Sequence, residues 1–440
     1  MLTTGSAPWA VPVLGHAYQL GRRPLDFLDS LPAHGDLVQI KLGPWRAHVL
    51  CHPDLVHQVL VDDRTFDKGG PFIDRFRDVV GDSLGTCRHR DHRRQRRLVQ
   101  PAFHRRRMPG YGAVASERID AVIRSWQHGQ MIDVPAEMHD LTMATVTRTL
   151  FANAVEAPLI TEIGRCVEAV TRGVARRVVL PVTLIGKIPT TGNRRFDRAR
   201  DRLHRLTGGL IADYRRAGVD HGDLLSMLLT TEDDDGPGMT DEEIHDQVLM
   251  FFLAAVEATP ALLSWACYLL GRHPEIQARL QDEADAVLAG SVAEHDDLPR
   301  LGLTQRVVTE TLRLYPPGWL LTRTTTADVE LAGHPVPAGT TIVFSPYLLG
   351  RRAELFPDPG RFDPDRWLDG EMRLPRGAFV PFGEGARKCI GDGFAKNQAA
   401  LTLASIAARW RLQLTPSFRV RAAWRAVLAP RSLPMRPARR

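Results

Sequence analysis

One cysteine stands in a stretch that could bind a metal ion. The segment FVPFGEGARKCIGDGFA covers residues 379–395, and Cys389 follows Arg387 and Lys388 and precedes a predicted helix. Adjacent positive charge and the free N–H groups of a helix start favour thiolate, so we expect a lowered thiol pKa. No histidine base stands nearby, so a metal-ligating thiolate is favoured over a nucleophile and over a buried inert cysteine.

A second chemically unusual stretch is FFLAAVEATPALLSWACYLL, residues 251–270. It is an apolar helical pattern that contains one carboxylate, Glu257, and one proline, Pro260. A buried carboxylate is costly unless it is paired or neutralised, and a proline inside a helix costs about 3 kcal/mol. Because both features occur within four residues, we expect this helix to have a function beyond packing in the core.

Basic residues gather in RHRDHRRQRRLVQPAFHRRRM, residues 88–108. This block could contact nucleic acid, dock an acidic protein, bind an internal anion or form a solvated helix face. The rest of the chain contains no nucleic-acid motif and no interleaved aromatic pattern, so we expect no nucleic-acid partner.

Three motifs, taken in order and spacing, resemble the cytochrome P450 monooxygenase family. FGEGARKCIG matches the family's haem-binding loop, in which Phe, Gly, Arg, Cys and Gly have fixed spacing. ETLR, with Glu310 and Arg313 three residues apart, and Arg366 of FDPDRW resemble the family's Glu–Arg–Arg network. The resemblance covers the chain from VPVLGH to its end. Within the family, the chain is most similar in appearance to actinobacterial terpenoid oxygenases. It implies one mainly helical domain with a minor β part.

The resemblance implies haem b as cofactor, with Cys389 as the iron ligand and Phe382 and Gly383 in the loop around it. The propionates would be held by four basic residues: His92, Arg96, Arg323 and Arg387. Three neighbouring arginines, at positions 93, 94 and 97, are expected to face solvent and, with Lys388, to dock an acidic ferredoxin. NAD(P)H, ferredoxin reductase and ferredoxin would supply the electrons, and O2 would be the co-substrate.

The implied reaction is oxidation of a hydrophobic small molecule, with a terpenoid as the expected class. The expected pocket residues are Phe72, Phe76, Phe252, Ala255, Val256, Trp319, Leu320 and Leu321, each of which could instead be plain core. The expected catalytic positions are Glu257, Ala258 and Thr259. Alanine at position 258 departs from the family's pattern, which has an alcohol there. Glu257 could relay protons or simply pair with an arginine.

Two rival interpretations remain open at this point. A haem protein of the same fold could act as a peroxide-driven oxidant or an isomerase, which the missing alcohol at Ala258 motivates. A haem-free basic binding protein could merely mimic the cysteine loop.

The elements that must position these residues follow from patterning. Residues 1–65 read as a small β-rich part, with strands in DLVQIKL and RAHVLC, and residues 66–440 as a helical body that contains the cysteine loop. Residues 66–87 read as irregular, and Thr240 with Glu243 forms a capping box that starts the long apolar helix.

Bulk composition limits the remaining possibilities. The chain has 440 residues, a net charge of +6, and no linker or repeat, so a single domain is expected. Five cysteines without CxxC spacing suit a reducing compartment. No signal peptide is evident, and the longest unbroken apolar run, VLMFFLAAV, is shorter than the roughly 20 residues of a membrane span. We therefore expect a cytoplasmic monomer without a membrane anchor.

Overall fold

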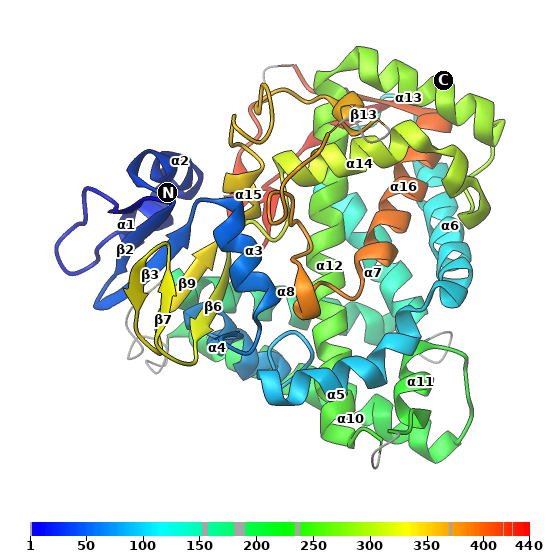
Figure 1. The fold of residues 1–440 in the computed structure, drawn as a ribbon. Helices are drawn as coiled ribbons and strands as arrows, with labels where there is room; N and C mark the ends of the chain where they lie inside the picture. Colours follow the sequence, from blue (N-terminus) through cyan, green and yellow to red (C-terminus); the bar gives the residue numbers. More distant parts are fainter. Residues whose placement is uncertain are drawn as a thin grey trace.

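The computed structural model describes residues 2–151, 157–179, 190–233, 238–368, 372–416, 418–424 and 426–440. Helices form most of the molecule and surround one long central helix, α12 (Figure 1). The α-helices are α1 (Ala17–Arg22), α2 (Pro24–Ser30), α3 (Pro53–Val61), α4 (Pro71–Val80), α5 (His89–Val99), α6 (Met108–Ser125), α7 (Val134–Phe151), α8 (Ala157–Val179), α10 (Thr191–Ala217), α11 (Leu224–Thr230), α12 (Asp241–Arg272), α13 (Pro274–Leu288), α14 (Gly302–Leu314), α15 (Pro346–Leu349) and α16 (Asp392–Arg409).

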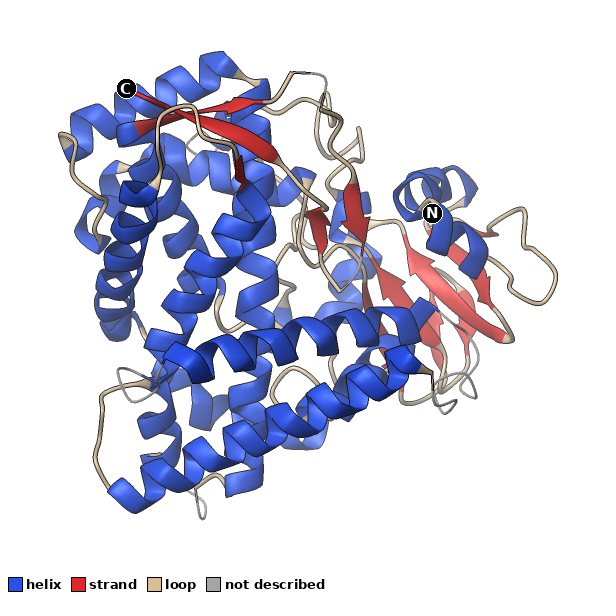
Figure 2. Cartoon of the chain, turned by 180° about the vertical axis from the view of Figure 1, so that it is seen from behind, coloured by secondary structure: helices blue, strands red, loops and turns tan. Residues whose placement is uncertain are grey.

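The strands gather mainly at one end of the molecule (Figure 2). One sheet has the order β1 (Thr4–Ser6), β2 (Leu37–Leu42), β3 (Trp45–Leu50), β9 (Thr341–Phe344), β6 (Leu321–Thr325), β4 (Phe66–Asp67). The smaller sheets are β10 (Trp410–Leu414), β13 (Pro434–Arg439), β5 (Ile132–Asp133); β11 (Ala422–Trp424), β12 (Leu428–Pro430); and β7 (Val329–Leu331), β8 (His334–Val336).

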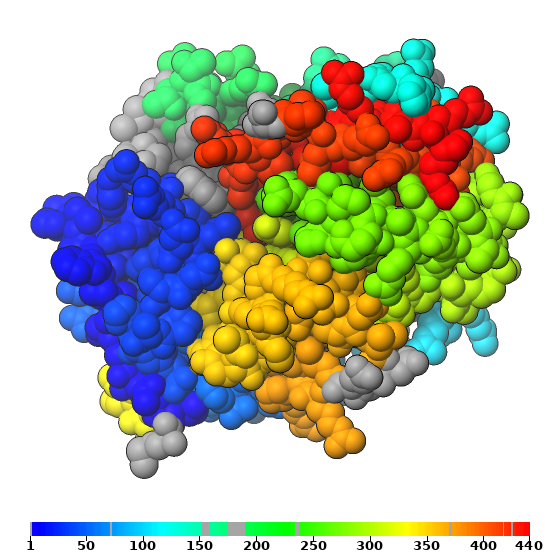
Figure 3. Space-filling model, turned by 90° about the horizontal axis from the view of Figure 1, so that it is seen from above, coloured from blue at the N-terminus to red at the C-terminus, as the bar shows by residue number. Residues whose placement is uncertain are grey.

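The large sheet joins parts of the chain that are far apart in sequence. Strand β3 pairs parallel with β9, and β9 and β4 both pair antiparallel with β6. The β part therefore extends beyond residues 1–65 to include segments near positions 66 and 321–344. Seen from above, the N-terminal residues form one edge of the molecule, beside the yellow and orange segments (Figure 3).

The predicted capping box starts α12. The Thr240 hydroxyl accepts from the Glu243 N–H at 3.1 Å, and the Glu243 carboxylate accepts from the Thr240 N–H at 2.9 Å. The helix continues through Pro260 to Arg272. By length and composition, α12 could cross a membrane, although its longest unbroken apolar run did not indicate this. In the structure, 72% of its most apolar stretch is buried inside the protein.

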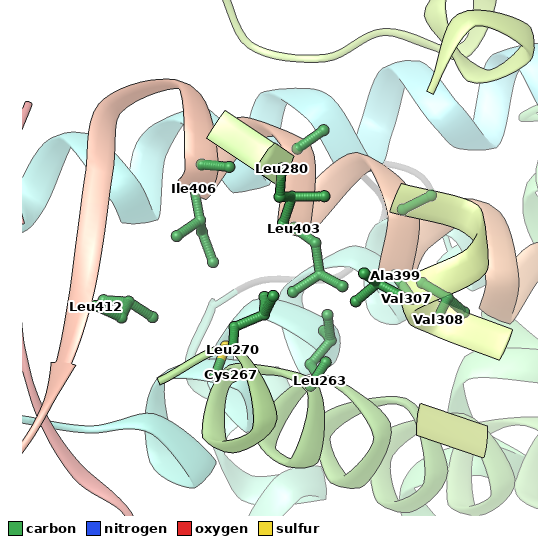
Figure 4. Close-up of a cluster of buried hydrophobic side chains, with 14 of the residues drawn as sticks. Leu263, Cys267, Leu270, Leu280, Val307, Val308, Ala399, Leu403, Ile406 and Leu412 are labelled. Carbon is green, nitrogen blue, oxygen red and sulfur yellow. The ribbon is translucent and has the colours of Figure 1, made fainter. Parts of the chain in front are cut away.

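The main core lies where α12 meets α13, α14 and α16. Figure 4 shows Leu263, Cys267 and Leu270 of α12 facing Val307, Leu280, Leu403 and their neighbours. A second cluster packs the first half of α12 against α4, α7, α8 and α10. Because α12 is apolar around most of its circumference, it can be buried by both clusters at once.

The expectation of irregular structure across residues 66–87 was wrong in part. Residues Pro71–Val80 form α4, which begins with proline at its first position and ends at Gly81. Proline at the first helical position is compatible with a helix, because its missing N–H would be unpaired there.

Candidate functional site

The Cys389 loop has a tightly turned backbone. The Cys389 N–H donates to the Phe382 carbonyl at 2.9 Å, and Gly383 and Gly385 adopt positive φ values of 73° and 70°. A Cβ on Gly385 would lie 2.5 Å from the Leu60 carbonyl oxygen, so only glycine fits this approach to α3. Helix α16 begins at Asp392, as the sequence predicted.

Cys389 is the one exposed cysteine among the five, yet it lies in a desolvated environment. The two facts agree if the thiol opens onto a hollow inside the protein. Its flanking residues support this position: Phe382 packs against the first core cluster and Ile390 against the second, and α12 belongs to both.

The prediction of a lowered thiol pKa was wrong for Cys389. Burial is the largest influence and raises the pKa of Cys389, outweighing the Gly391 N–H, Arg96 and Lys68, which lower it. Because a bound metal ion deprotonates a coordinating thiol, this shift does not argue against ligation.

Four basic side chains form one electrostatic cluster near the cysteine loop: Arg323, His92, Arg96 and Arg387. Arg323, on β6, is 3% exposed, and one amino group donates to the Thr322 carbonyl at 2.9 Å. Its Nε atom is buried and has no hydrogen-bond partner among the described residues. Burial, reinforced by Arg387, lowers the Arg323 pKa to about 10. His92 is buried on α5, where desolvation, Arg387 and Arg96 lower its pKa to about 3, so it is neutral at pH 7.

Lys68 belongs to the same cluster, and sequence reasoning missed it. Burial lowers its pKa well below the usual value, and Arg323 and Arg387 lower it further. Within the described residues its amino group has no acidic partner. Strand β4 places it there, because Asp67 pairs with Thr324, the neighbour of Arg323. The signal in the sequence was a lone lysine beside two glycines in an arginine-rich chain.

Arg96 and Arg387 differ in how many of their guanidinium groups' hydrogen bonds are already made to protein atoms. Arg96 donates to the Lys388 carbonyl at 2.7 Å, which ties α5 to the cysteine loop. Arg387 donates to Asp63 at 3.0 Å, to Asp67 at 2.8 Å and to the Cys87 carbonyl at 2.9 Å. All three of its nitrogen atoms therefore have protein partners.

The arginines expected to face solvent behave differently from one another. Arg94 binds Glu243 at 2.6 Å, and both Arg94 and Arg97 pair with Asp233, whose side chain is only 4% exposed. Arg97 is exposed, as expected, although it is paired, whereas Arg94 is half-buried between Asp233 and Glu243. Arg93 is exposed and has no acidic partner among the described residues.

A wide basic groove runs along α5 and reaches the cysteine loop. Its volume is about 1140 Å³, and its lining consists of Asp63, His89, His92, Arg93, Arg96, Arg97, Gln100, Pro101, His104, Arg106, Arg107, Gly385 and Ala386. We call this the basic groove. It combines a positive surface with direct contact to the loop that carries Cys389.

The structure brings Glu310, Arg313 and Arg366 together. Arg313 donates two 2.8 Å bonds to Glu310, and Arg366 donates a third at 3.1 Å. Glu310 and Arg313 are fully buried, and Arg313 also donates to the Gly350 carbonyl at 2.6 Å. A Cβ on Gly350 would lie 2.4 Å from the Arg313 carbonyl oxygen, so glycine is needed at this close approach.

The middle of α12 has one open face. Ala254 is exposed, and Ala258, one turn later on the same side, is half-buried, as is Glu257. Thr259 is buried, and no hydrogen bond among the described residues involves its hydroxyl. Phe252 and Val256 point into the second core cluster, so the open face of the helix is lined by small side chains.

The other expected pocket residues lie in three different places. Phe76 and Ala255 pack at the edge of the second core cluster, and Trp319 and Leu320 belong to the cluster beside the large sheet. Leu321 begins β6 and packs against the cluster on the other side of that sheet. Phe72 lies in α4, but its side chain is outside the described part of the structure.

Comparison with known proteins adds an independent line of evidence. The family model named Cytochrome P450 matches residues 6–429. The chain is 48% identical to the pentalenene oxygenase of Streptomyces avermitilis, covering 98% of this chain and 96% of that protein. It is 48% identical to the cyclooctat-9-en-7-ol 5-monooxygenase of Streptomyces melanosporofaciens, covering 94% and 90%. It is 46% identical to the cyclooctatin synthase of the same organism, covering 94% and 91%.

Proposed function

The chain belongs to the cytochrome P450 family, and from that premise we propose that it is a monooxygenase that inserts one oxygen atom from O2 into a terpenoid. The family match and the named relatives identify the chain as an oxidoreductase, and the proteins to which it is similar act on terpenoids. The observation that carries the proposal for this chain is the exposed Cys389 thiol beside a buried cationic cluster. A haem needs this combination of one soft anionic ligand and several cations for its carboxylates.

We propose that Cys389 ligates the iron of haem b and that four residues hold its propionates: Arg323, Arg96, His92 and Lys68. Arg323 supports this most directly, since its Nε donor is buried and no group in the described part of the chain accepts from it. Arg387 has a different role in the proposal, because Asp63 and Asp67 already bind it. In this role Arg387 holds the cysteine loop in place against β4. When bound, the haem supplies O2 activation, with thiolate donation that favours O–O cleavage.

The open face of α12 forms the proposed oxidation site. Small side chains at positions 254 and 258 would leave room beside a bound haem for an apolar skeleton, which the protein would orient by contact rather than by charge. We propose that Glu257 delivers protons through water held at the Val256 carbonyl, which Pro260 cannot bond because it lacks an N–H. We do not include Thr259 in this proton path. It follows Ala258 by one residue, which turns its side chain about 100° around the helix and away from the open face.

Electrons come from NAD(P)H through a reductase and an acidic ferredoxin in this proposal. The basic groove supports the docking site, because it is predominantly cationic and touches Gly385 and Ala386 of the cysteine loop. A shallow positive surface steers an acidic partner by long-range attraction. A ferredoxin docked there would lie next to the loop that carries the proposed iron ligand.

The test is turnover of cyclic terpene hydrocarbons by the haem-loaded protein with NADPH, a ferredoxin and its reductase under 18O2. We expect 18O in the product, with one atom for each hydroxyl group formed. Oxidation that requires added peroxide, or a rearranged product without 18O, would instead favour the peroxide-driven oxidant or the isomerase.

A further inference from the structure

We propose that this protein binds the surface of anionic membranes through an apolar patch at its N-terminal edge. The N-terminal patch consists of Trp9, Val13, Leu14, Tyr18 and Trp45, whose side chains are 85%, 90%, 38%, 45% and 45% exposed. Large apolar groups gathered on a rim of a protein mark an interaction site. This proposal does not depend on which substrate is oxidised.

The backbone holds the two most exposed side chains outward at a conformational cost. Trp9 and Val13 both have φ values of 67°, in the left-handed region. A β-branched residue there is a genuine outlier, and such strain persists only where the surrounding structure enforces it. The exposure of these residues is therefore built into the loop.

A buried histidine fixes this loop to the sheet. His16 is 2% exposed, and one ring nitrogen lies 3.2 Å and 3.0 Å from the carbonyl oxygens of Ala7 and Pro8. Its other ring nitrogen accepts from the Lys41 N–H at 2.9 Å. The Gly43 N–H donates to the Leu14 carbonyl at 3.0 Å, which places the loop against the β2–β3 turn that carries Trp45.

The segments that form the patch, residues 9–23 and 41–46, contain basic residues and no acidic ones. Arg22, Arg23, Lys41 and Arg46 are exposed beside it, and Arg22 donates to the Tyr18 hydroxyl at 2.6 Å. The first acidic residue of the chain is Asp26, and none occurs in residues 37–52. A basic rim around protruding Trp and Tyr side chains complements a surface of anionic headgroups over hydrocarbon.

The shape of the patch favours a bilayer over a protein partner. The loop that carries Trp9 and Val13 projects from the edge of the molecule, drawn dark blue at the left of Figure 1, and its side chains protrude instead of lining a groove. A fluid bilayer accepts separate protruding side chains without a matching surface, whereas a protein partner needs shape complementarity.

The experiment is co-sedimentation of the haem-loaded full chain with vesicles of phosphatidylglycerol and phosphatidylcholine, compared with phosphatidylcholine alone. We expect binding to the anionic vesicles that weakens as salt is added. The double variant Trp9→Ser/Val13→Ser should lower the partition coefficient at least about tenfold, because two apolar insertions are lost. Val219→Ser, which changes a side chain that is 56% exposed elsewhere, is the matched control and should bind like the wild type.

A second readout separates insertion from adsorption. Brominated lipid should quench part of the tryptophan fluorescence, and Trp9→Phe should lose that part while it keeps most of the binding. The proposal is overturned if the wild type does not bind anionic vesicles, or if the double variant binds as well as the wild type. It is also overturned if the patch variants only dissociate a dimer in solution.

Discussion

Arg323 illustrates how a single buried cation can report on the cofactor. Its Nε donor has no partner within the ranges that the structure describes and its surroundings are basic, so a propionate would satisfy it. We predict that Arg323→Ala lowers haem affinity by about tenfold, because a charge-assisted hydrogen bond contributes about 1–3 kcal/mol. Haem content and haem transfer to apomyoglobin measure this effect. Arg411→Ala, at an exposed position, is the control. Equal haem retention in the two variants would contradict the assignment.

Glu310 has a structural role that can be separated from catalysis. Its carboxylate accepts from Arg313, Arg366 and Trp367 in a fully buried setting. We predict that Glu310→Ala lowers the free energy of unfolding by about 3–5 kcal/mol, because it leaves two guanidinium groups without their anion. Denaturant unfolding of the haem-loaded protein measures this loss. Glu354→Ala removes an exposed pair with Arg352 and should cost at most about 1 kcal/mol.

At the residue scale, local spacing could predict some site residues and could not predict others. Cys389 and the pair Glu310 and Arg313 lie within short motifs, so the sequence alone places them. Lys68 reaches Arg323 only through β4–β6 pairing across more than 250 residues. Arg94 meets Asp233 through a loop that folds back onto α5. No periodicity encodes such contacts, which depend on tertiary packing.

At the element scale, α12 determines how protons reach the site. We predict that Glu257→Gln diverts reducing equivalents to peroxide, because the amide cannot release a proton to the water chain. Thr259→Val should leave coupling nearly unchanged, since the proposed water path does not include Thr259, which is buried. Pro260→Ala should also uncouple, because it restores the N–H that bonds the Val256 carbonyl. The measurement is product formed per NADPH consumed, with peroxide titrated in parallel.

The outcome of these variants separates two arrangements of α12. Uncoupling by Thr259→Val, without uncoupling by Glu257→Gln, would mean that the hydroxyl at position 259 replaces the alcohol missing at Ala258. That result would require the helix to be locally rewound near Pro260 when the haem is bound.

Helices and strands were more predictable than the faces they expose. The capping box at Thr240 and Glu243 fixed the start of α12, and alternation in residues 37–50 indicated β2 and β3. Phe252 and Val256 were expected in the pocket but lie in the core. Because α12 is apolar on nearly all sides, periodicity cannot tell which face packs and which stays open.

At the scale of the whole molecule, the basic groove should govern electron transfer. We predict that Arg93→Glu raises the KM for ferredoxin several-fold and weakens its dependence on salt, since the variant loses a steering charge. The CO-bound spectrum should stay unchanged, because Arg93 is exposed and lies outside the cationic cluster. Arg411→Glu makes the same charge change on β10 and should leave the KM as it is. If both variants behave alike, docking occurs elsewhere.

The absorption spectrum of the reduced, CO-bound protein tests the central claim most directly. A haem that is ligated by a thiolate has its reduced, CO-bound Soret band displaced far to the red, whereas a haem with a neutral ligand does not. We predict the displaced band in the wild type and in Cys87→Ala, whose cysteine contacts Arg387. We predict its loss in Cys389→Ala. A haem-loaded wild type without the displaced band, or a displaced band that survives in Cys389→Ala, would contradict this account.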